Sequence, residues 1–498
     1  MKLVLRYRFA IALFIVVACS FVLMVWASAN TSLWNDEFAT IDSLQVDQSF
    51  SAFITSEVTN GFTGVNFFHL VARIWFQIVP YGDNWLLLLS NLASCVALVF
   101  TGLSGRLLKG SAAGILSCVF LATSHAMIIY CATEFRFYGF TLMFASMVMY
   151  FYIKRNQSYP SISIKNTVFF GVVMGLLVNV QLLAAPVLIA PFICDCILFV
   201  RRRISIKSFL PYLIACLFVF PGYFIRLLSG GTASGYLWNP SMDPTFANAF
   251  RLISGELLDG SPLRLFFYIL GVSVAIVLVI RAIIYKASPQ RRSSLLITVI
   301  TCTPLVNIAL LLLLSRTVEG YMIFMTRYIS WTLPFIAVAS AFGIFWLLEQ
   351  VKPQGVNRMV PAAICCVLFL YLLQTDIVKI DENPGTDHYQ KEVVTWISEH
   401  EEVYSPDACV VWADWWVKGI KDYYFDKQGI PAPENMLGLQ ETFVANGTFG
   451  ADGIDRIYYV ITIADMNDEM NAAWEWLGYT KAETISIEWI PRIHVWER

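Results

Sequence analysis

Charged residues are scarce in this chain: Asp, Glu, Lys and Arg make up 14% of its 498 residues, whereas soluble domains carry about a quarter. Hydrophobic residues make up 57%, more than a soluble surface accommodates. This balance predicts a polytopic α-helical membrane protein with some soluble mass. The formal net charge of −2 lacks the basic excess of nucleic-acid-binding proteins, so we expect no nucleic acid partner.

The chain also lacks the spaced motifs of common metal and redox sites. It contains no Cys-x-x-Cys, His-Glu-x-x-His or Asp-x-Asp sequence, and its five histidines are scattered. Most of the eleven cysteines lie in apolar runs, where a thiol behaves as a small hydrophobic group. We therefore expect no cofactor, disulfide framework or zinc site. A divalent metal at the adjacent carboxylates Asp36 and Glu37 stays open, although the spacing does not support one.

Eleven apolar runs approach the length that a membrane-spanning helix needs. They are Phe9–Ser28, Trp85–Gly105, Ala112–Tyr130, Tyr138–Ile153, Thr167–Leu183, Pro186–Val200, Phe209–Leu227, Leu263–Ile284, Leu295–Leu314, Tyr328–Leu348 and Met359–Leu373. When these runs alternate across the membrane, six short loops rich in Lys and Arg fall on one side, which is then cytoplasmic. We therefore predict a protein of the cytoplasmic (inner) membrane with a cytoplasmic N-terminus and an extracytoplasmic C-terminal tail. The first run is predicted to stay as a span, although Ala27-Ser28-Ala29 resembles a signal-peptide cleavage site.

The composition divides the chain into a membrane domain, residues 1–375, and a soluble tail, residues 376–498. In the tail, strand patterns alternate with amphipathic helices, which predicts a small extracytoplasmic α/β domain. In the membrane domain, residues 29–84 form a long first outer loop. Its apolar segment Val65–Pro80 is predicted to lie along the outer interface as an amphipathic helix, because a span here would move every later basic loop outside. A second outer loop, Leu228–Pro262, is either a lid or a connector.

Two adjacent carboxylates, Asp36 and Glu37, follow the first span within the segment Trp34-Asn35-Asp36-Glu37-Phe38. Acids in the first turn of an interfacial helix complement the helix dipole, and Asn35 would supply the cap. Alternatively, one carboxylate accepts a proton from an acceptor hydroxyl or holds a metal or sugar. The residues alone leave both interpretations open.

A second group of ionisable residues, Glu134, Arg136 and Tyr138, lies where one predicted span ends and the next begins. Ionisable groups at such places cost energy and are functional candidates by default. Glu134 and Arg136 either pair with each other to hold the turn or bind a ligand. A guanidinium can do both, since it keeps donors for a phosphate while paired to a carboxylate.

A third group, Arg327 and Tyr328, precedes the predicted span that contains Pro334. Arg327 either extends its charge to the interface to reach water or binds a ligand. Arg316, Glu319, Tyr321 and Arg327 gather in one short outer loop, against the usual cytoplasmic bias of basic residues. Cations held on the outer face predict an anionic ligand there, and a lipid phosphate lies at that depth.

Six segments occur in the order found in one family. They read WNDEF, NFFHLVARIW, GDNWLLLLSNLASCVALVFTGLSGRLL, YCATEFRFYGF, RRR and TRYISWTLPF. With the soluble tail, this ordered set resembles the bacterial GT-C membrane glycosyltransferases, the group with the protein mannosyltransferase-like and aminoarabinose transferase-like enzymes. The resemblance covers about residues 1–350 in order, and the tail more loosely. It implies a GT-C-like membrane domain.

Enzymes of this family take a sugar from a polyprenyl phosphate and transfer it on the outer face of the inner membrane. The resemblance implies that Asp36 is the catalytic base for the acceptor hydroxyl, with Glu37 beside it in support. It implies that Arg136 and Arg327 bind the phosphate of the donor. The acceptor would be a glycan, a lipid or a protein.

The same resemblance implies that Glu134 and Tyr138 orient these groups. The sequence departs from the commoner family form at two places. The interfacial helix begins GVNFFHL where a Pro-Pro-Leu start is usual, which weakens any inference about the acceptor. YCATEFRFY replaces the more usual Gln-Glu-Ala-Arg-x-Tyr pattern but keeps its Glu, Arg and Tyr, so the charged set is intact.

Two other functional classes stay open at this stage. A transporter or flippase of lipid-linked sugars also needs charges within a membrane domain. It would show internal repeats or charges deep inside its spans, whereas the charges here gather at the outer edge. A non-catalytic member of an envelope assembly, with the tail as its binding module, is the third class.

Overall fold

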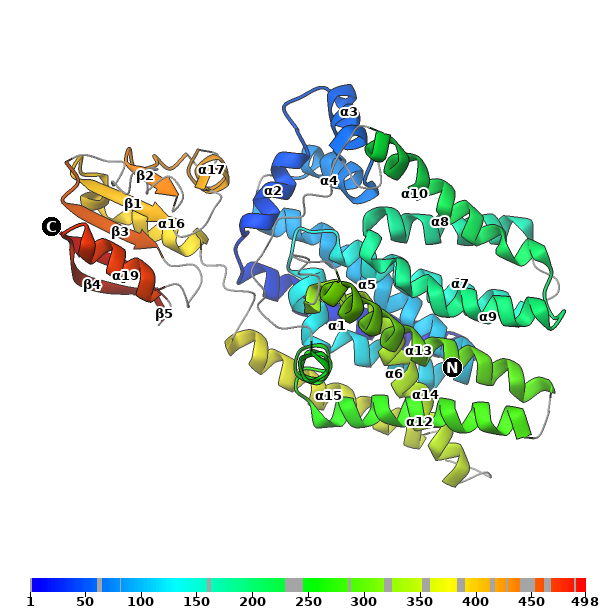
Figure 1. Ribbon diagram of the computed structural model, residues 1–498. Helices are drawn as coiled ribbons and strands as arrows, with labels where there is room; N and C mark the ends of the chain where they lie inside the picture. The colour runs from blue at the N-terminus through cyan, green and yellow to red at the C-terminus, as the bar shows by residue number, and fades with distance from the viewer. Residues whose placement is uncertain are drawn as a thin grey trace. The chain divides into compact units, whose positions relative to one another are not determined.

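The computed structural model describes residues 2–60, 65–80, 82–158, 163–228, 245–284, 288–317, 325–351, 359–382, 390–412, 417–426, 429–438, 453–460, 467–487 and 490–498. Contacts divide the chain into two compact units (Figure 1). The first unit, called the membrane unit, comprises Met1–Ser28 and Val46–Pro384. The second, called the tail unit, comprises Ala29–Gln45 and Gly385–Arg498. A short piece of the predicted first outer loop therefore groups with the tail. The predicted domain limits at 375 and 376 stay a prediction.

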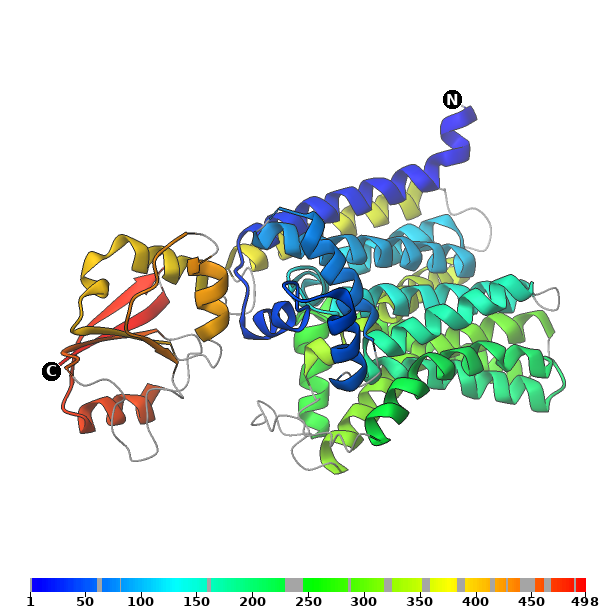
Figure 2. The same ribbon diagram turned by 90° about the horizontal axis from the view of Figure 1, so that it is seen from above.

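The membrane unit is built of helices. They are α1 Lys2–Ala29, α3 Phe50–Asn60, α4 Phe67–Ile78, α5 Asp83–Lys109, α6 Ser111–Ala122, η1 Met127–Ala132, α7 Tyr138–Ser158, α8 Ile164–Val180, η2 Leu182–Leu188, α9 Ile189–Val200, η3 Ile206–Phe209, α10 Leu210–Leu228, α11 Phe246–Arg251, η4 Leu252–Leu257, α12 Pro262–Ile284, α13 Ser288–Thr317, η5 Thr326–Tyr328, η6 Ser330–Thr332, α14 Leu333–Val351 and α15 Met359–Glu382. Figures 1 and 2 show α7, α8, α9, α12 and α13 running roughly along one direction.

Every predicted span falls on helical structure. Within the described part of the chain, six helices are long and apolar enough to cross a membrane. They are Tyr7–Ala29, Asp83–Lys109, Leu182–Val200, Pro262–Arg281, Ser294–Arg316 and Ser330–Gln350. The protein is therefore a multi-pass membrane protein, as its composition predicts. The count of eleven spans and the orientation of the termini stay predictions.

One predicted span, Ala112–Tyr130, is not a continuous α-helix. It is divided into α6 and the π-helical turn η1. At the break, the Thr123 hydroxyl donates to the Val119 carbonyl at 2.8 Å, and the Ser124 amide bonds Leu121 three residues back at 3.1 Å. Such local bonds compete with the regular helix ladder, which a hydropathy pattern cannot reveal.

Helix α5 lies at the centre of the membrane unit, where it packs against α6, α7 and α14. A row of small polar residues on α5 is buried in these contacts: Ser90, Asn91, Ser94, Thr101 and Ser104. A Cβ atom added at Gly114 of α6 would lie 2.5 Å from the carbonyl oxygen of Gly102 on α5. Glycine is therefore required there for the two helices to approach.

A buried ion pair joins α7 and α9. Arg155 donates from Nη2 to Asp195 Oδ2, and the two side chains are 7% and 0% exposed. Tyr212 donates to the same Asp195 oxygen at 2.9 Å, and Arg155 Nη1 donates to the Ser208 carbonyl at 3.1 Å. The pair is therefore enclosed by hydrogen bonds that also reach α10 and η3. The ion pair therefore holds these helices together.

The tail unit contains α2 Asn35–Ser43 and a small α/β fold. That fold comprises α16 Gln390–Glu399, η7 Glu401–Tyr404, β1 Ala408–Trp412, α17 Val417–Ile420, η8 Lys421–Asp426, β2 Met436–Gly438, β3 Arg456–Val460, α19 Asn467–Trp476, β4 Thr480–Ile487 and β5 Ile490–Glu497. The strand order is β2-β1-β3-β5-β4. Strand β1 is parallel to β2 and β3, whereas β5 is antiparallel to β3 and β4. The alternating pattern of the tail thus corresponds to helices and a mixed sheet. An extracytoplasmic location stays a prediction.

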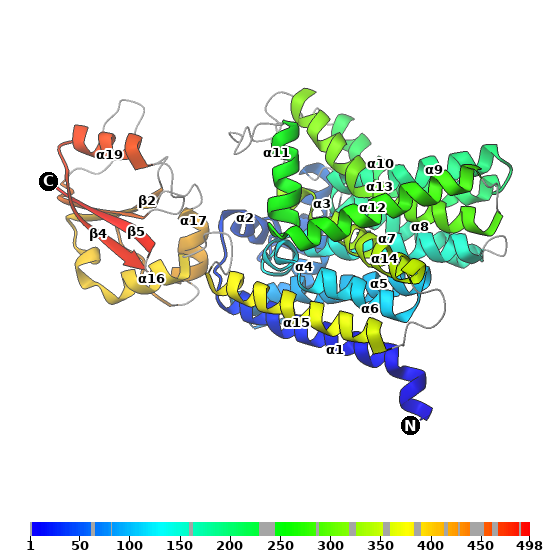
Figure 3. The ribbon, with the colours of Figure 1, turned by 90° about the horizontal axis from the view of Figure 1, so that it is seen from below.

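The sheet is covered on both faces, by α16 and by α19 (Figure 3). Trp474 of α19 is fully buried against Tyr459 of β3, with ring centroids 6.0 Å apart. On the other face, Trp396 of α16 lies 6.1 Å from Tyr458. All residues of β1 are buried, as expected of a central strand covered on both sides.

Candidate functional site

The predicted acidic pair opens helix α2, in the tail unit. The Glu37 side chain is fully buried, and its carboxylate accepts the backbone N–H of Trp34 at 2.9 Å. Such a bond satisfies one of the amides at the start of a helix. Asp36 is only half-buried. The first interpretation of the pair therefore describes Glu37, except that the N-cap is Trp34 and not the predicted Asn35, which is the first residue of the helix. Asp36 keeps part of its surface exposed.

The Glu134 segment belongs to the membrane unit and follows the π-helical turn η1. The Thr133 amide bonds the carbonyl of Ile128, five residues earlier, at 3.0 Å. A Cβ atom added at Gly139 would lie 2.5 Å from the Cys131 carbonyl oxygen, so the next helix can begin this close to η1 only at a glycine. Isolated π-turns of this kind are frequent at functional sites.

Hydrogen bonds to α5 hold the Glu134 segment in place. Ser90 donates to the Glu134 carbonyl at 2.7 Å, and Ser94 donates to the Cys131 carbonyl at 3.2 Å. The Glu134 side chain is 1% exposed. The acid is therefore enclosed at the predicted outer end of the membrane unit, on a backbone that α5 fixes.

Arg136 stacks on an aromatic ring that belongs to a larger cluster of rings. Its guanidinium carbon lies 5.1 Å from the centre of the Phe137 ring. Phe68 of α4 packs against Phe135 and Phe137, with centroids 5.9 and 6.5 Å apart.

The predicted interfacial segment forms a helix, α4. Its N-cap is Asn66, whose side chain accepts from the Phe68 amide at 2.9 Å. Its location at the membrane interface stays a prediction.

The third predicted group, Arg327 and Tyr328, lies beside the second group, which contains Tyr138. The ring of Tyr328 lies 6.2 Å from that of Tyr138. The Tyr138 side chain is fully buried and lies within electrostatic range of Glu134, Arg136 and Arg327. The structure therefore brings together all five predicted substrate-binding residues, although they come from two segments far apart in sequence. Arg136 and Arg327 are partly exposed.

The sequence reasoning missed Glu256 and Thr326, which also lie in this group. The Thr326 hydroxyl donates to the Glu256 carboxylate, and Tyr130 is within electrostatic range of Glu256 and Arg327. Burial raises the pKa of the Glu256 carboxyl, and the charge of Arg251 partly opposes this. Glu256 falls in the described part of the second outer loop. An acid beside a predicted span was the only sequence signal for it.

We call Glu134, Arg136, Tyr138, Glu256, Arg327 and Tyr328 the outer cluster. It combines the enclosed acid Glu134 and the half-buried acid Glu256 with two partly exposed arginines and two tyrosines. Two partly exposed guanidinium groups in one cluster can bind a phosphate through charge-assisted hydrogen bonds. Glu319 and Tyr321, which were predicted to accompany Arg327, lie outside the described residues.

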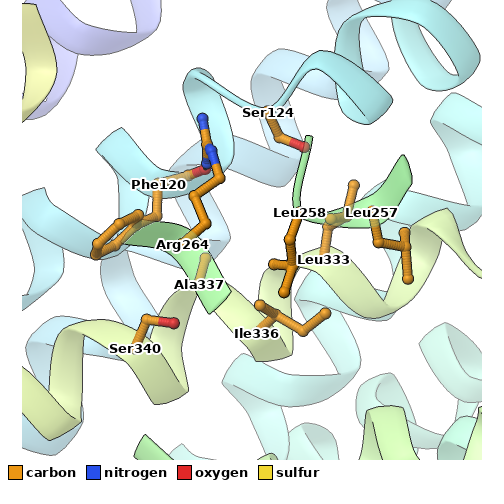
Figure 4. Close-up of a pocket in the computed structure, with 9 residues that line it drawn as sticks. All are labelled: Phe120, Ser124, Leu257, Leu258, Arg264, Leu333, Ile336, Ala337 and Ser340. Carbon is orange, nitrogen blue, oxygen red and sulfur yellow. The ribbon is translucent and has the colours of Figure 1, made fainter. Parts of the chain in front are cut away.

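The membrane unit also contains a pocket, beside a second buried ion pair (Figure 4). Arg264 Nε lies 3.0 Å from Asp259 Oδ2, and its other nitrogens donate to the Phe120 carbonyl at 2.9 Å and to the Thr123 hydroxyl at 3.0 Å. Figure 4 shows Leu257, Leu258, Leu333 and Ile336 on the side of the pocket opposite Arg264. The pocket is thus mainly apolar. The Arg264 guanidinium pairs with Asp259 and donates to the C-terminal end of α6.

Among the residues that the structure describes, no three His, Cys, Asp or Glu side chains gather in a way that could hold a metal ion. Asp36 and Glu37 form a pair without a third ligand of this kind in that part of the chain. The expected absence of a cofactor stays a prediction.

No protein-family model matches the chain, and no curated protein matches it in sequence. Solved structures do match it in fold. ArnT from Cupriavidus metallidurans, bound to undecaprenyl phosphate, has a TM-score of 0.57 and 11% identity, and the match covers 97% of each chain. An oligosaccharyltransferase from Archaeoglobus fulgidus, tethered to an acceptor peptide, has a TM-score of 0.54 and 12% identity, covering 99% of this chain and 74% of that one. Both are GT-C proteins, so the GT-C fold predicted from the ordered motifs is confirmed. Identities this low establish the fold alone.

Proposed function

We propose that the chain is a glycosyltransferase that moves a sugar from a polyprenyl phosphate to the hydroxyl of a glycan, lipid or protein acceptor. The observation that carries this proposal is the outer cluster, in which Arg136 and Arg327 lie within range of Tyr138. The fold supports it, because a matching structure, ArnT, holds undecaprenyl phosphate. Fold alone does not establish function, so the cluster supplies the chemical part of the argument.

The proposed reaction takes place on the outer face of the cytoplasmic membrane, with the N-terminus inside and residues 376–498 outside. The basic loops support this orientation through the positive-inside rule. All parts of the outer cluster lie at predicted outer ends: η1 precedes α7, η5 precedes α14, and η4 precedes α12. The head group of a lipid-linked donor lies at that same depth.

In this proposal, Arg136 and Arg327 stabilise the phosphate as its bond to the sugar breaks. Phosphate is a good leaving group, so its charge needs stabilisation more than it needs a proton. Guanidinium groups held in fixed positions and partly screened from water provide that stabilisation without reorganising. Glu134 and the Tyr138 and Tyr328 rings hold the arginines in place.

Asp36 is proposed to deprotonate the acceptor hydroxyl, so that the oxygen attacks the anomeric carbon in a single displacement. The acceptor oxygen forms the new glycosidic bond while the sugar–phosphate bond breaks, and polyprenyl phosphate leaves with the bonding electrons. The proton passes to the Asp36 carboxylate. Glu37 supports this role by capping α2.

A short stretch of chain tethers Asp36 to Ser28, the last residue of the first membrane helix that belongs to the membrane unit. Asp36 comes eight residues after Ser28, so the connecting chain reaches at most about 28 Å. Within the membrane unit, Asn91 of α5 donates to the Ser28 hydroxyl at 3.2 Å, and the neighbouring Ser90 bonds the Glu134 carbonyl. Ser28, where the segment that carries Asp36 begins, is therefore bonded to α5, the same helix that holds the Glu134 backbone.

The other end of that segment also leads to the cluster. Arg73 of α4 donates to the Gln48 carbonyl at 2.7 Å, and its guanidinium lies 4.9 Å from the centre of the Phe53 ring. Helix α4 in turn packs Phe68 against Phe135. Both attachments of the base-bearing segment thus lie on elements that contact the Glu134 segment.

The test measures how fast the full chain, in membranes, releases undecaprenyl phosphate from a lipid-linked sugar. The donors are hexoses and pentoses linked to undecaprenyl phosphate, and an envelope extract supplies the acceptor. Asp36→Asn should lower the rate by roughly a hundred-fold or more, the usual contribution of a general base. Asp42→Asn is the matched control, because it makes the same change on an exposed residue of the same helix. It should keep the wild-type rate.

Full transfer by Asp36→Asn would contradict the role of Asp36. Folding of each variant is checked by its thermal unfolding midpoint and elution in detergent. If the wild-type chain carries the donor across vesicle membranes but releases no undecaprenyl phosphate, the glycosyltransferase proposal fails and the chain is a transporter of lipid-linked sugars.

A further inference from the structure

Residues 29–45 are held by the C-terminal part of the chain, within the tail unit. The Leu33 side chain is fully buried, and its backbone N–H donates to the Tyr424 hydroxyl at 2.8 Å. A buried amide requires a partner, and losing one costs free energy. Residues 391 positions apart in the sequence are therefore joined by a buried hydrogen bond just before the acidic pair.

An aromatic contact supports the same connection. Phe38 of α2 is almost fully buried, and its ring centroid lies 5.8 Å from that of Tyr423 and 5.8 Å from that of Tyr424. The Phe38 and Tyr424 rings meet edge to face, at 87°, a favourable arrangement for aromatic pairs. Both tyrosines belong to η8.

A third contact reaches a different element. The Ser32 hydroxyl donates to the Glu392 carboxylate of α16 at 3.4 Å. Ser32, Leu33 and Phe38 therefore flank Asp36 on both sides and are all buried, while Asp36 itself stays half-exposed. Together with the Glu37 cap, these contacts fix the backbone of the segment that carries Asp36.

We propose that the tail domain, residues 390–498, holds α2 in the orientation that its base requires, and that Tyr424 is the positioning residue. This inference rests on the proposed function, in which Asp36 accepts the acceptor proton. Tyr424 acts through the Leu33 backbone and touches no substrate. A base displaced by about an ångström loses much of its rate advantage, so the hydrogen bond should matter to turnover more than to donor binding.

The experiment compares Tyr424→Phe with Tyr479→Phe in the full chain. Tyr424→Phe removes only the hydroxyl and keeps the ring beside Phe38. Tyr479 is the matched control, since it is buried in the same domain and its hydroxyl donates to the Ile454 carbonyl at 2.8 Å. Two readouts are taken: the kcat and donor KM of undecaprenyl phosphate release, and hydrogen exchange of peptides covering residues 29–45.

Tyr424→Phe should lower kcat by roughly ten-fold, leave the donor KM unchanged and speed exchange at Leu33. Tyr479→Phe should leave both kcat and the hydrogen exchange of residues 29–45 at their wild-type values. Wild-type exchange in Tyr424→Phe would overturn the contact, and faster exchange with an unchanged kcat would overturn its positioning role. If the wild-type chain has no transferase activity, the proposed function fails, and exchange at Leu33 still decides whether the tail domain holds the segment.

Ser32→Ala keeps the test decisive if Tyr424→Phe does not fold. This small change removes the hydroxyl that bonds Glu392 and leaves Leu33 and Tyr424 in place. It should speed exchange of residues 29–45 and lower kcat in the same direction, by a smaller factor. Wild-type exchange and kcat in this variant would contradict the proposal.

Discussion

Two groups of charged residues in the membrane unit use the same residue types in different ways. Arg155 and Asp195 form a closed pair, 7% and 0% exposed, whose hydrogen bonds end on Ser208 and Tyr212. In the outer cluster, Arg136 and Arg327 keep part of their surface exposed at the ends of predicted spans. A sealed pair serves the fold, whereas cations that reach the surface can also meet an anionic ligand.

The first way to test this comparison is to break the sealed pair. Asp195→Ala leaves the Arg155 charge buried without its carboxylate, and breaking such a pair by removing one partner costs about 3–5 kcal/mol. The free energy of unfolding in detergent should fall by that amount. The rate per folded molecule of undecaprenyl phosphate release should change little, because the pair lies outside the outer cluster.

The matched variant for the sealed pair is Glu349→Ala. Its carboxylate pairs with Lys109, but its side chain is 59% exposed, and exposed pairs contribute little to stability. An equal loss of stability in the two variants would contradict the distinction between sealed and exposed charges.

A smaller effect is expected at Glu256, in the outer cluster. Burial raises the pKa of this carboxyl in the folded state, so the folded chain binds the proton more readily than the unfolded chain. Stability should therefore rise as pH falls from neutral through that raised pKa. Glu256→Gln should remove this dependence of stability on pH. Thermal unfolding midpoints measure it between about pH 4 and pH 8, a range that extends upward from the usual carboxyl pKa of about 4.3. A wild-type midpoint that falls steadily over the same change in pH would contradict the shift.

The sequence anticipates much of the membrane unit because its signals are local. A long apolar run predicts a helix by itself, and Glu134, Arg136 and Tyr138 are close in sequence and so remain close in space. The approach of Arg327 and Tyr328 to that group was predicted from alternation of the spans, together with the family resemblance. The ring contact between Tyr138 and Tyr328 agrees with it.

Other features depend on contacts that no local pattern encodes. The bond between Thr326 and Glu256 joins segments 70 residues apart, and that between Leu33 and Tyr424 joins segments 391 apart. The π-turn η1 arises where a hydropathy pattern predicts an unbroken span. Asp36 and Glu37 look alike in sequence, and the structure distinguishes them by the burial of Glu37 and its hydrogen bond from the Trp34 amide.

The central claim is that the outer cluster binds the phosphate of a lipid-linked donor. Its most direct test is the affinity of the full chain for undecaprenyl phosphate, comparing wild type with the double variant Arg136→Gln, Arg327→Gln. Arg281→Gln is the control, since Arg281 is an exposed arginine at the predicted cytoplasmic end of α12, with its guanidinium carbon 5.7 Å from the centre of the Trp346 ring. The claim predicts that the double variant binds at least roughly ten-fold more weakly while the control binds normally. Wild-type affinity in the double variant would contradict it.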